Sequence, residues 1–304
     1  MAGSVSSQVA APTPVPRPKL RDVVALLKPI TWFPPMWAFV CGVVSSGVPV
    51  AERWPFLIAG ILLTGPLVCG TSQAINDWFD RHVDAINEPN RPIPSGRIAG
   101  RWGLWIACVG TALASLVAAL TGPWVLAATL LGLACAWAYS APPLRLKADG
   151  WAGPAVVALT YEGLTWFTGA AVMLGALPAT PILVVLLLYS LGAHGIMTLN
   201  DFKAVAGDRE TGVRSLPVRL GIGPAARLAC VVMAVPQAIV AVLLARWGHD
   251  TSALIVAGLL TLQLGLMARM LRDPARFAPW YNATGTSAYV LGMLAAALGL
   301  GGAI

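Results

Sequence analysis

The sequence PILVVLLLYSLGAHGIMTLN, residues 181–200, decides the fold class of this chain. It contains no Asp, Glu, Lys or Arg, and about 20 mostly apolar residues are enough for a helix to span a membrane. Working outward from it, we find eight more apolar segments that fit a span. The chain is therefore predicted to be an all-α, multi-pass membrane protein with nine spans, at residues 29–50, 55–75, 102–121, 124–141, 151–173, 181–200, 224–245, 251–270 and 281–302.

The composition supports this class. Of the 304 residues, 57% are hydrophobic and 11% are charged, whereas about a quarter of a soluble domain is charged. Residues 1–18 are rich in Ala, Pro, Ser and Val without a long apolar run, which predicts a disordered tail and no signal peptide. We expect a cytoplasmic tail over residues 1–20 and one membrane domain over 21–304. The five cysteines are scattered through apolar stretches without metal spacing, so neither disulfides nor a cysteine metal site is predicted.

The basic residues predict the orientation. With nine spans, eighteen of the 20 Lys and Arg residues fall on one side of the membrane, and only Arg53 and Arg246 fall on the other. Cytoplasmic loops carry such an excess, so the N-terminus and the long loops are expected in the cytoplasm. The net charge of +7 is explained by topology, and no nucleic-acid partner is predicted. A basic face also suits anionic lipid and a diphosphate ligand.

An acidic cluster follows the second span, in residues 76–84 (NDWFDRHVD). If the helix continues, Asp77, Asp80 and Asp84 share one face, and their carboxylates repel one another. A divalent cation relieves that repulsion, and Mg²⁺ typically binds one or two carboxylates together with substrate phosphates. The cluster therefore predicts a magnesium–diphosphate site. The alternative is a solvated loop with unrelated acids.

A second acidic cluster follows the sixth span. Asp201 and Asp208 are seven residues apart and share a face if the segment is helical. Plain surface ion pairs with the neighbouring bases are an open alternative. Both clusters begin with Asn-Asp and lead to an Arg shortly before a proline, Arg91 and Arg214. This shared pattern indicates an internal repeat whose two acidic helices face one cavity.

Basic side chains accompany the clusters. Two prolines end the fourth span and are followed by Arg145 and Lys147. A diphosphate needs cations of this kind, although contact with lipid headgroups would also explain them. With Lys203 and Arg91, these residues are the predicted diphosphate-binding set.

The first cluster matches the motif NDxxDxxxD in full, and this resembles the intramembrane prenyltransferase family typified by 4-hydroxybenzoate polyprenyltransferases. The resemblance implies about nine helices around a central cavity open to the cytoplasmic side, with two aspartate motifs facing it. The second motif departs from the common DxxxD, because Ala204 stands four residues before Asp208. Asp201 is expected to supply the missing ligand. The residues implied to be catalytic are Asn76, Asp77, Asp80, Asp84, Asp201 and Asp208, and all of these except Asp77 are implied Mg²⁺ ligands.

Longer strings narrow the resemblance to the chlorophyll and bacteriochlorophyll synthase branch of that family: ITWFPP at 30–35, NEPNRPIPSG at 87–96 and NDFKAVAGDRETGVRSLP at 200–217. This branch implies transfer of a geranylgeranyl or phytyl group from its diphosphate to the propionate of bacteriochlorophyllide, releasing diphosphate. It also implies the inner (intracytoplasmic) membrane and pigment-assembly proteins as partners. A propionate is already ionised at neutral pH, so no general base is expected.

Three residues are candidates for binding the acceptor. Tyr139 ends the fourth span, Glu162 lies within the fifth, and His194 lies within the sixth. An ionisable group inside a span is a functional candidate. A hydrogen-bonded structural role is the alternative for Glu162, and helix packing is the alternative for His194.

The sequence is also compatible with three other functions. The chain could prenylate another acceptor, such as chlorophyllide, a quinone precursor or haem. It could be a membrane transporter, although transporters usually place their sites near the bilayer midplane, whereas these acids lie at span ends. It could also be a non-catalytic pigment-assembly protein, in which the aspartates would be dispensable.

Overall fold

The computed structural model describes residues 15–304, so the first fourteen residues of the tail predicted over 1–20 lie outside the described part. The described chain is almost entirely helical. Its only β feature is an isolated parallel bridge between Asp149 and Arg214. The helices are α1 (Leu20–Leu26), η1 (Pro29–Thr31), α2 (Phe33–Ser45), α3 (Val50–Leu62), η2 (Leu63–Cys69), α4 (Gly70–Asn87), α5 (Trp102–Thr121), α6 (Pro123–Ser140), η3 (Leu146–Ala148), α7 (Ala152–Ala158), η4 (Leu159–Gly163), α8 (Leu164–Leu174), α9 (Thr180–Asn200), η5 (Asp201–Lys203), α10 (Val205–Thr211), α11 (Leu216–Leu220), α12 (Ile222–Arg246), α13 (Asp250–Met270) and α14 (Pro274–Leu300).

The described residues contain eight helices long and apolar enough to cross a membrane, and nine if one bent pair counts as a span. The predicted multi-pass all-α fold is therefore confirmed. The bent pair consists of Leu20–Thr31 and Phe33–Ser45, which meet at 60°, and the first predicted span, 29–50, begins just before this bend. Lys28 adopts a left-handed φ of 46° immediately before Pro29, and a proline cannot continue a preceding helix without strain. The second predicted span is longer than expected, because α3, η2 and α4 form one 38-residue helix from Val50 to Asn87.

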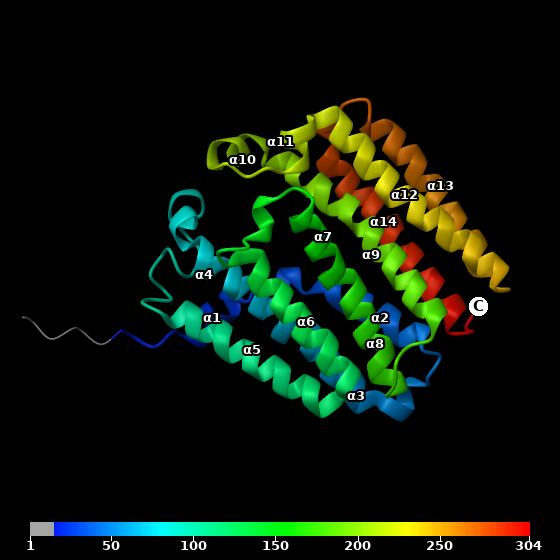
Figure 1. The fold of residues 1–304 in the computed structure, drawn as a ribbon, viewed down its shortest axis with the longest axis horizontal. Coiled ribbons are helices and arrows are strands. Elements are labelled where there is room, and N and C mark those ends of the chain that lie inside the picture. Colours follow the sequence, from blue (N-terminus) through cyan, green and yellow to red (C-terminus); the bar gives the residue numbers. More distant parts are fainter. Residues whose placement is uncertain (1–14) are drawn as a thin grey trace, which may run out of the picture.

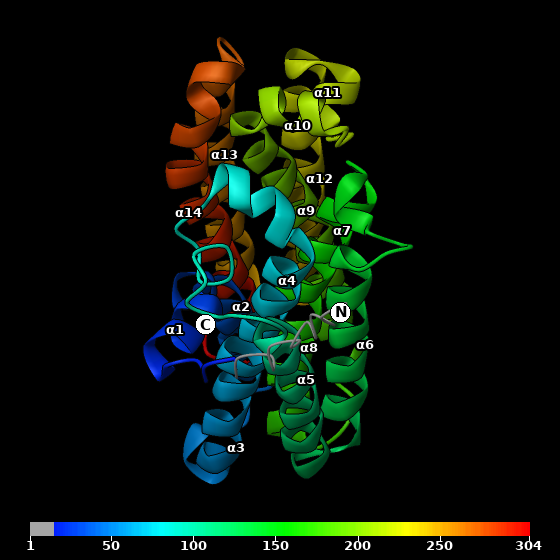
Figure 2. The same cartoon turned by 90° about the vertical axis from the view of Figure 1, so that its left-hand side faces the viewer.

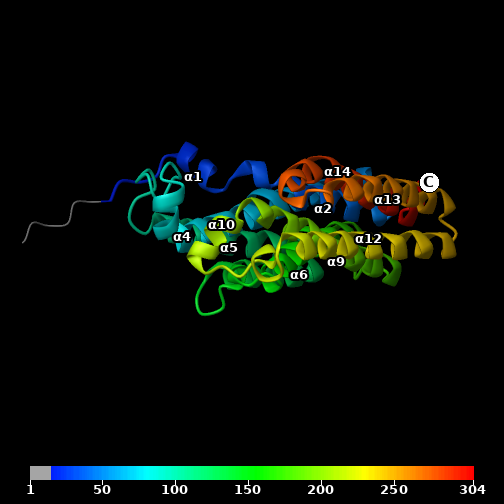
Figure 3. The ribbon, with the colours of Figure 1, turned by 90° about the horizontal axis from the view of Figure 1, so that it is seen from above.

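The long helices lie side by side, with their ends gathered at two opposite ends of the molecule (Figure 1). The short elements α1, α10 and α11 and the end of α4 lie at one end, and α3 and the C-terminus lie towards the other (Figure 1). Figure 2 faces the first of these ends and shows α10 and α11 above α4. Within the bundle α9 packs on α12, α13 on α14, and α2 on α8. Seen from above, α12, α13 and α14 occupy one side of the molecule and α1, α4 and α5 the other (Figure 3).

Small residues allow α2 and α8 to approach closely. A Cβ on Gly42 would overlap the backbone carbonyl of Trp166, and a Cβ on Gly169 would overlap the carbonyl of Phe39. Interfaces of this type are common between membrane helices, where close van der Waals packing drives association. The Trp166 indole also donates to Ser45 Oγ at 3.0 Å, which fixes the register of the two helices.

Arg53 lies at the end of the bundle opposite to α10 and α11. Its guanidinium donates to the carbonyl oxygens of Met173 and Val172 at 3.1 and 3.2 Å. These carbonyls belong to the last turn of α8 and have no backbone N–H donors further along that helix. Arg53 therefore caps α8 far from the acidic clusters.

Candidate active site

A cavity of about 890 Å³ opens between the helices at the end where α1, α10 and α11 lie. Its wall includes Asp80 and Asp84 of α4, and also Asp201 of η5 and Asp208 of α10. Two acidic segments more than a hundred residues apart in the sequence therefore face one hollow. Asn76, one turn before Asp80, lines it too and donates to Ser140 Oγ of α6 at 3.3 Å.

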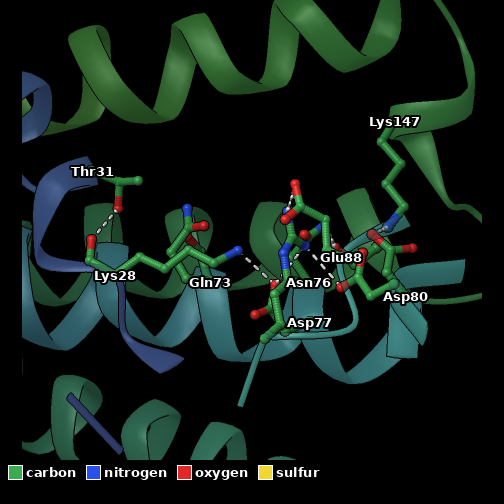
Figure 4. A network of polar contacts seen from close by, with 12 residues as sticks. Lys28, Thr31, Gln73, Asn76, Asp77, Asp80, Glu88 and Lys147 are labelled. Atoms are coloured by element: carbon green, nitrogen blue, oxygen red, sulfur yellow. Dashed lines mark hydrogen bonds and ion pairs between the residues drawn. The ribbon is translucent and has the colours of Figure 1, made fainter. Parts of the chain in front are cut away.

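Asp77 does not line this cavity. Its side chain is fully buried, and Oδ1 lies 2.6 Å from Lys28 Nζ and 3.4 Å from Arg91 Nη1. Figure 4 shows Lys28 reaching from the N-terminal segment to this carboxylate. Asp77 thus joins α4 to the segment between α1 and η1.

Arg91 joins two of the α4 carboxylates outside the cavity. Its Nη1 lies 2.8 Å from Asp84 Oδ2, besides the contact with Asp77, and its Nη2 lies 3.7 Å from Glu88. Burial alone would lower the pKa of the Arg91 guanidinium, but the carboxylates of Asp77, Asp84 and Glu88 together raise it above its usual value. Arg91 therefore fixes the direction of Asp84 while Asp84 still faces the cavity.

Lys147 and Arg145 contribute the cations of the cavity wall. Lys147 Nζ lies 2.5 Å from Asp80 Oδ2, and Arg145 Nη2 lies 3.7 Å from Asp80 Oδ1 (Figure 4 shows the lysine contact). The Lys147 side chain is only 13% exposed. Its burial lowers the pKa of the ammonium, although the Asp80 carboxylate acts in the opposite direction.

The second acidic segment is not one continuous helix. α9 ends at Asn200, a short 3₁₀ turn covers Asp201–Lys203, and α10 begins at Val205. The interpretation of Asp201 and Asp208 as one helical face is therefore wrong, but the break still leaves both on the cavity wall. Ser215 Oγ donates to Asp208 Oδ2 at 2.6 Å. Lys203, which belonged to the predicted diphosphate-binding set, is exposed and does not line the cavity.

Of the three acceptor candidates, Tyr139 and Glu162 line the cavity. His194 does not. Its Nε2 lies 3.3 Å from the Trp151 carbonyl oxygen, and it borders a separate apolar hollow of about 450 Å³ beside Trp151. The structure thus places His194 in a packing position between α9 and α7.

Two groups near the site were missed by sequence reasoning. The first is Lys28, which the sequence presents only as one of many positive charges. No local pattern pairs it with the Asp77 carboxylate, 49 residues away. The second group is Tyr161 of η4. Its hydroxyl accepts from Gln73 Nε2 at 3.1 Å and lies 3.3 Å from Cys69 Sγ, which joins η4 to η2 and α4.

The donor chemistry of the wall fits Mg²⁺. No three His, Cys, Asp or Glu side chains among residues 15–304 converge closely enough to enclose a metal by themselves. Mg²⁺ rarely needs such a cage, since it usually takes one or two carboxylates and completes its shell with water and substrate phosphates. Five oxygen-bearing side chains around one hollow meet that need: Asn76, Asp80, Asp84, Asp201 and Asp208.

Comparison with known proteins gives a consistent result. The model of the UbiA prenyltransferase family matches residues 31–287. The chain is 57% identical to the bacteriochlorophyll synthase 33 kDa chain of Cereibacter sphaeroides, with 96% of each chain covered. It is 52% identical to the protein of the same name from Rhodobacter capsulatus, covering 98% of this chain and 99% of the relative. The fold resembles a UbiA homologue from Archaeoglobus fulgidus solved with GPP and Mg²⁺, at a TM-score of 0.69 and 19% identity, covering 88% of this chain and 99% of that one.

Proposed function

Since this chain belongs to the UbiA prenyltransferase family and is a multi-pass membrane prenyltransferase, we propose that it esterifies the propionate of bacteriochlorophyllide with a geranylgeranyl or phytyl group from the corresponding diphosphate. The observation that carries the proposal is the shared cavity. It combines carboxylates from both acidic segments with Arg145 and Lys147 at one end, and it continues between apolar spans. The relatives named bacteriochlorophyll synthase support the choice of acceptor.

The charged end of the cavity is suited to a diphosphate. Arg145 and Lys147 follow α6, line the cavity and form ion pairs with Asp80. Both can donate hydrogen bonds to phosphate oxygens, and charge-assisted bonds of this kind are the strong ones. Asp77, paired with Lys28 and Arg91, would hold α4 in position while the neighbouring carboxylates bind the ligand.

Mg²⁺, held by Asn76, Asp80, Asp84, Asp201 and Asp208, would supply electrostatic stabilisation of the negative charge that develops on the departing diphosphate. The protein side chains perform the positioning. Arg145 and Lys147 bind the phosphate oxygens, and the spans exclude water from the prenyl chain, which would lie between them. The distribution of Lys and Arg supports placing this charged end at the cytoplasmic face of the inner (intracytoplasmic) membrane.

The bond changes are simple. The bond from the first prenyl carbon to the diphosphate oxygen breaks, and a propionate oxygen forms the new bond to that carbon. The products are an ester and free diphosphate. Because the propionate is already ionised at neutral pH, no residue is assigned as a general base.

The test is turnover by the full chain in membranes. Bacteriochlorophyllide should be esterified with geranylgeranyl or phytyl diphosphate, and EDTA should stop the reaction until Mg²⁺ is added back. Chlorophyllide, a quinone precursor and haem serve as competing acceptors. Faster transfer to any of these than to bacteriochlorophyllide would overturn the proposed acceptor, and undiminished turnover in EDTA would overturn the metal assignment.

A further inference from the structure

The cavity reaches far below its charged end. Its wall follows one continuous helix from Asp84 and Asp80 of α4 down to Thr64 of η2. Sixteen residues separate Asp80 from Thr64, which corresponds to about 24 Å at a rise of 1.5 Å per residue. The deep half is thus a distinct region, bounded by η2 on one side and η4 on the other.

The depth of Glu162 within the cavity is fixed by its neighbour. The Tyr161 hydroxyl lies 3.3 Å from Cys69 Sγ of η2, so this part of η4 stands at the level of Cys69. Cys69 is eleven residues before Asp80, or about 16 Å along the helix. Glu162 therefore belongs to the deep half, well away from the carboxylates and cations at the charged end.

Nearly all polar side chains around the deep half already have partners within the protein. The hydroxyl groups donate to backbone carbonyls one turn earlier, as is usual for Ser and Thr in helices, and Gln73 donates to the Tyr161 hydroxyl. The hydroxyl donors are Thr64 to Gly60, Ser72 to Cys69, Thr160 to Val156 and Thr165 to Tyr161.

Glu162 is the exception. It lines the cavity, is 8% exposed, and its Oε2 has no hydrogen-bond partner among the described residues. Glu162 takes part in none of the ion pairs found among residues 15–304. A buried polar group without a partner destabilises the fold, so the Glu162 carboxyl does not stabilise the protein at this position.

The backbone gives a second, independent indication. η4 is a π-helical turn inside the span Ala152–Leu174, and η2 is a π-helical turn inside the span Val50–Asn87. Such wide turns are rare and are found frequently at functional sites. Here two of them meet across one cavity through Cys69 and Tyr161. Both turns therefore shape the region into which Glu162 is placed.

We propose that Glu162 hydrogen-bonds a carbonyl oxygen on the rim of the tetrapyrrole acceptor and thereby selects acceptors that carry this carbonyl. The inference rests on the proposed function. A prenyl tail has no polar atom to offer, and hydrocarbon against a bare carboxyl would leave it unpaired. A flat macrocycle whose propionate reaches the charged end carries keto and acetyl oxygens on the rest of its rim. A protonated carboxyl donates one hydrogen bond, which matches such an oxygen.

The experiment compares acceptors as well as variants of the full-length enzyme. The acceptors are bacteriochlorophyllide a, the same macrocycle with vinyl in place of its acetyl group, and the same macrocycle with its ring keto group reduced. The variants are Glu162→Gln, which keeps a donor and an acceptor, and Glu162→Leu, which keeps neither. Tyr281→Phe is the matched control, because the Tyr281 hydroxyl is also buried and unpartnered but is not part of the cavity wall.

A site that hydrogen-bonds a substrate group rejects analogues without that group. The wild type and the variants Glu162→Gln and Tyr281→Phe should each discriminate between acceptors. For one of the two modified acceptors, their kcat/KM should be about 10- to 100-fold lower than for bacteriochlorophyllide a. In Glu162→Leu that ratio should approach one, with KM for the prenyl diphosphate unchanged. Equal ratios in wild type and Glu162→Leu for both acceptors would overturn the inference, as would a wild type that discriminates against neither. Absence of any tetrapyrrole turnover by the wild type would instead overturn the proposed function.

Discussion

Replacing Lys28 by Met tests the link between the N-terminal segment and α4. Lys28 Nζ lies 2.6 Å from Asp77 Oδ1, and the Asp77 side chain is fully buried. At that distance the attraction is about 332/(20 × 2.6), or roughly 6 kcal/mol, for an effective dielectric constant of about 20. The desolvation of both charges offsets much of it. Removing one partner of a buried pair usually costs about 3–5 kcal/mol, because the other charge stays buried and unpaired.

The lower end of that range applies here. The Lys28 side chain is 22% exposed, and Arg91 Nη1 remains 3.4 Å from the same carboxylate oxygen. We therefore expect Lys28→Met to lower the free energy of unfolding by about 3 kcal/mol. Asp77→Asn should cost less after Lys28→Met than in the wild type, with a coupling of about 2 kcal/mol between the two positions.

The assay is reversible unfolding in mixed micelles, titrated with denaturing detergent. It compares the wild type, Lys28→Met, Asp77→Asn and the double variant. Lys19→Met is the matched control, because Lys19 is an exposed lysine of the same segment and its loss should change stability by less than about 0.5 kcal/mol. A Lys28→Met protein within 1 kcal/mol of the wild type, or strictly additive single effects, would refute the reasoning.

Three further predictions concern the site and the bundle. Asp80→Ala should lower kcat/KM at least about 100-fold while the protein still folds by the micelle assay; wild-type turnover would remove Asp80 from the site. Burial lowers the pKa of the Lys147 ammonium. As the pH rises, Lys147 therefore loses its charge at a lower pH than an exposed lysine would, and activity should fall with it. Lys147→Arg, which keeps its charge, should extend activity to higher pH, and an unchanged alkaline limb would contradict this. Gly169→Ala should cost about 1–3 kcal/mol, because its Cβ would overlap the Phe39 carbonyl. Gly258→Ala, with open space around its Cβ, should be neutral or slightly stabilising in the same unfolding assay.

The fold class was accessible from the sequence because membrane spans are encoded locally. Apolar runs of the required length predict the spans, and the bend of the first span is consistent with Pro29 and the prolines at 34 and 35. The continuation of α4 through the first acidic cluster followed from regular spacing. The shared cavity was expected from the resemblance and from the pattern shared by the two clusters.

Much of the site was not accessible in this way, because it depends on contacts between distant segments. Spacing places Asp77 near the face of Asp80, but the fold-back of the N-terminal segment decides that Asp77 meets Lys28. Spacing also predicted one helical face for Asp201 and Asp208, whereas the chain breaks between them. For His194, periodicity alone could not distinguish the cavity from the neighbouring helix α7.

The short bridge between Asp149 and Arg214 has a consequence for engineering the enzyme. Gly150 N donates to the Arg214 carbonyl at 2.9 Å, and Arg214 N donates to the Ala148 carbonyl at 3.0 Å. Two main-chain hydrogen bonds therefore join the turn that carries Lys147 to the loop that leads to Ser215, the partner of Asp208. A chimera with a related synthase would have to exchange both segments at once. Exchanging only one would place a segment of the other protein against the native partner of this bridge.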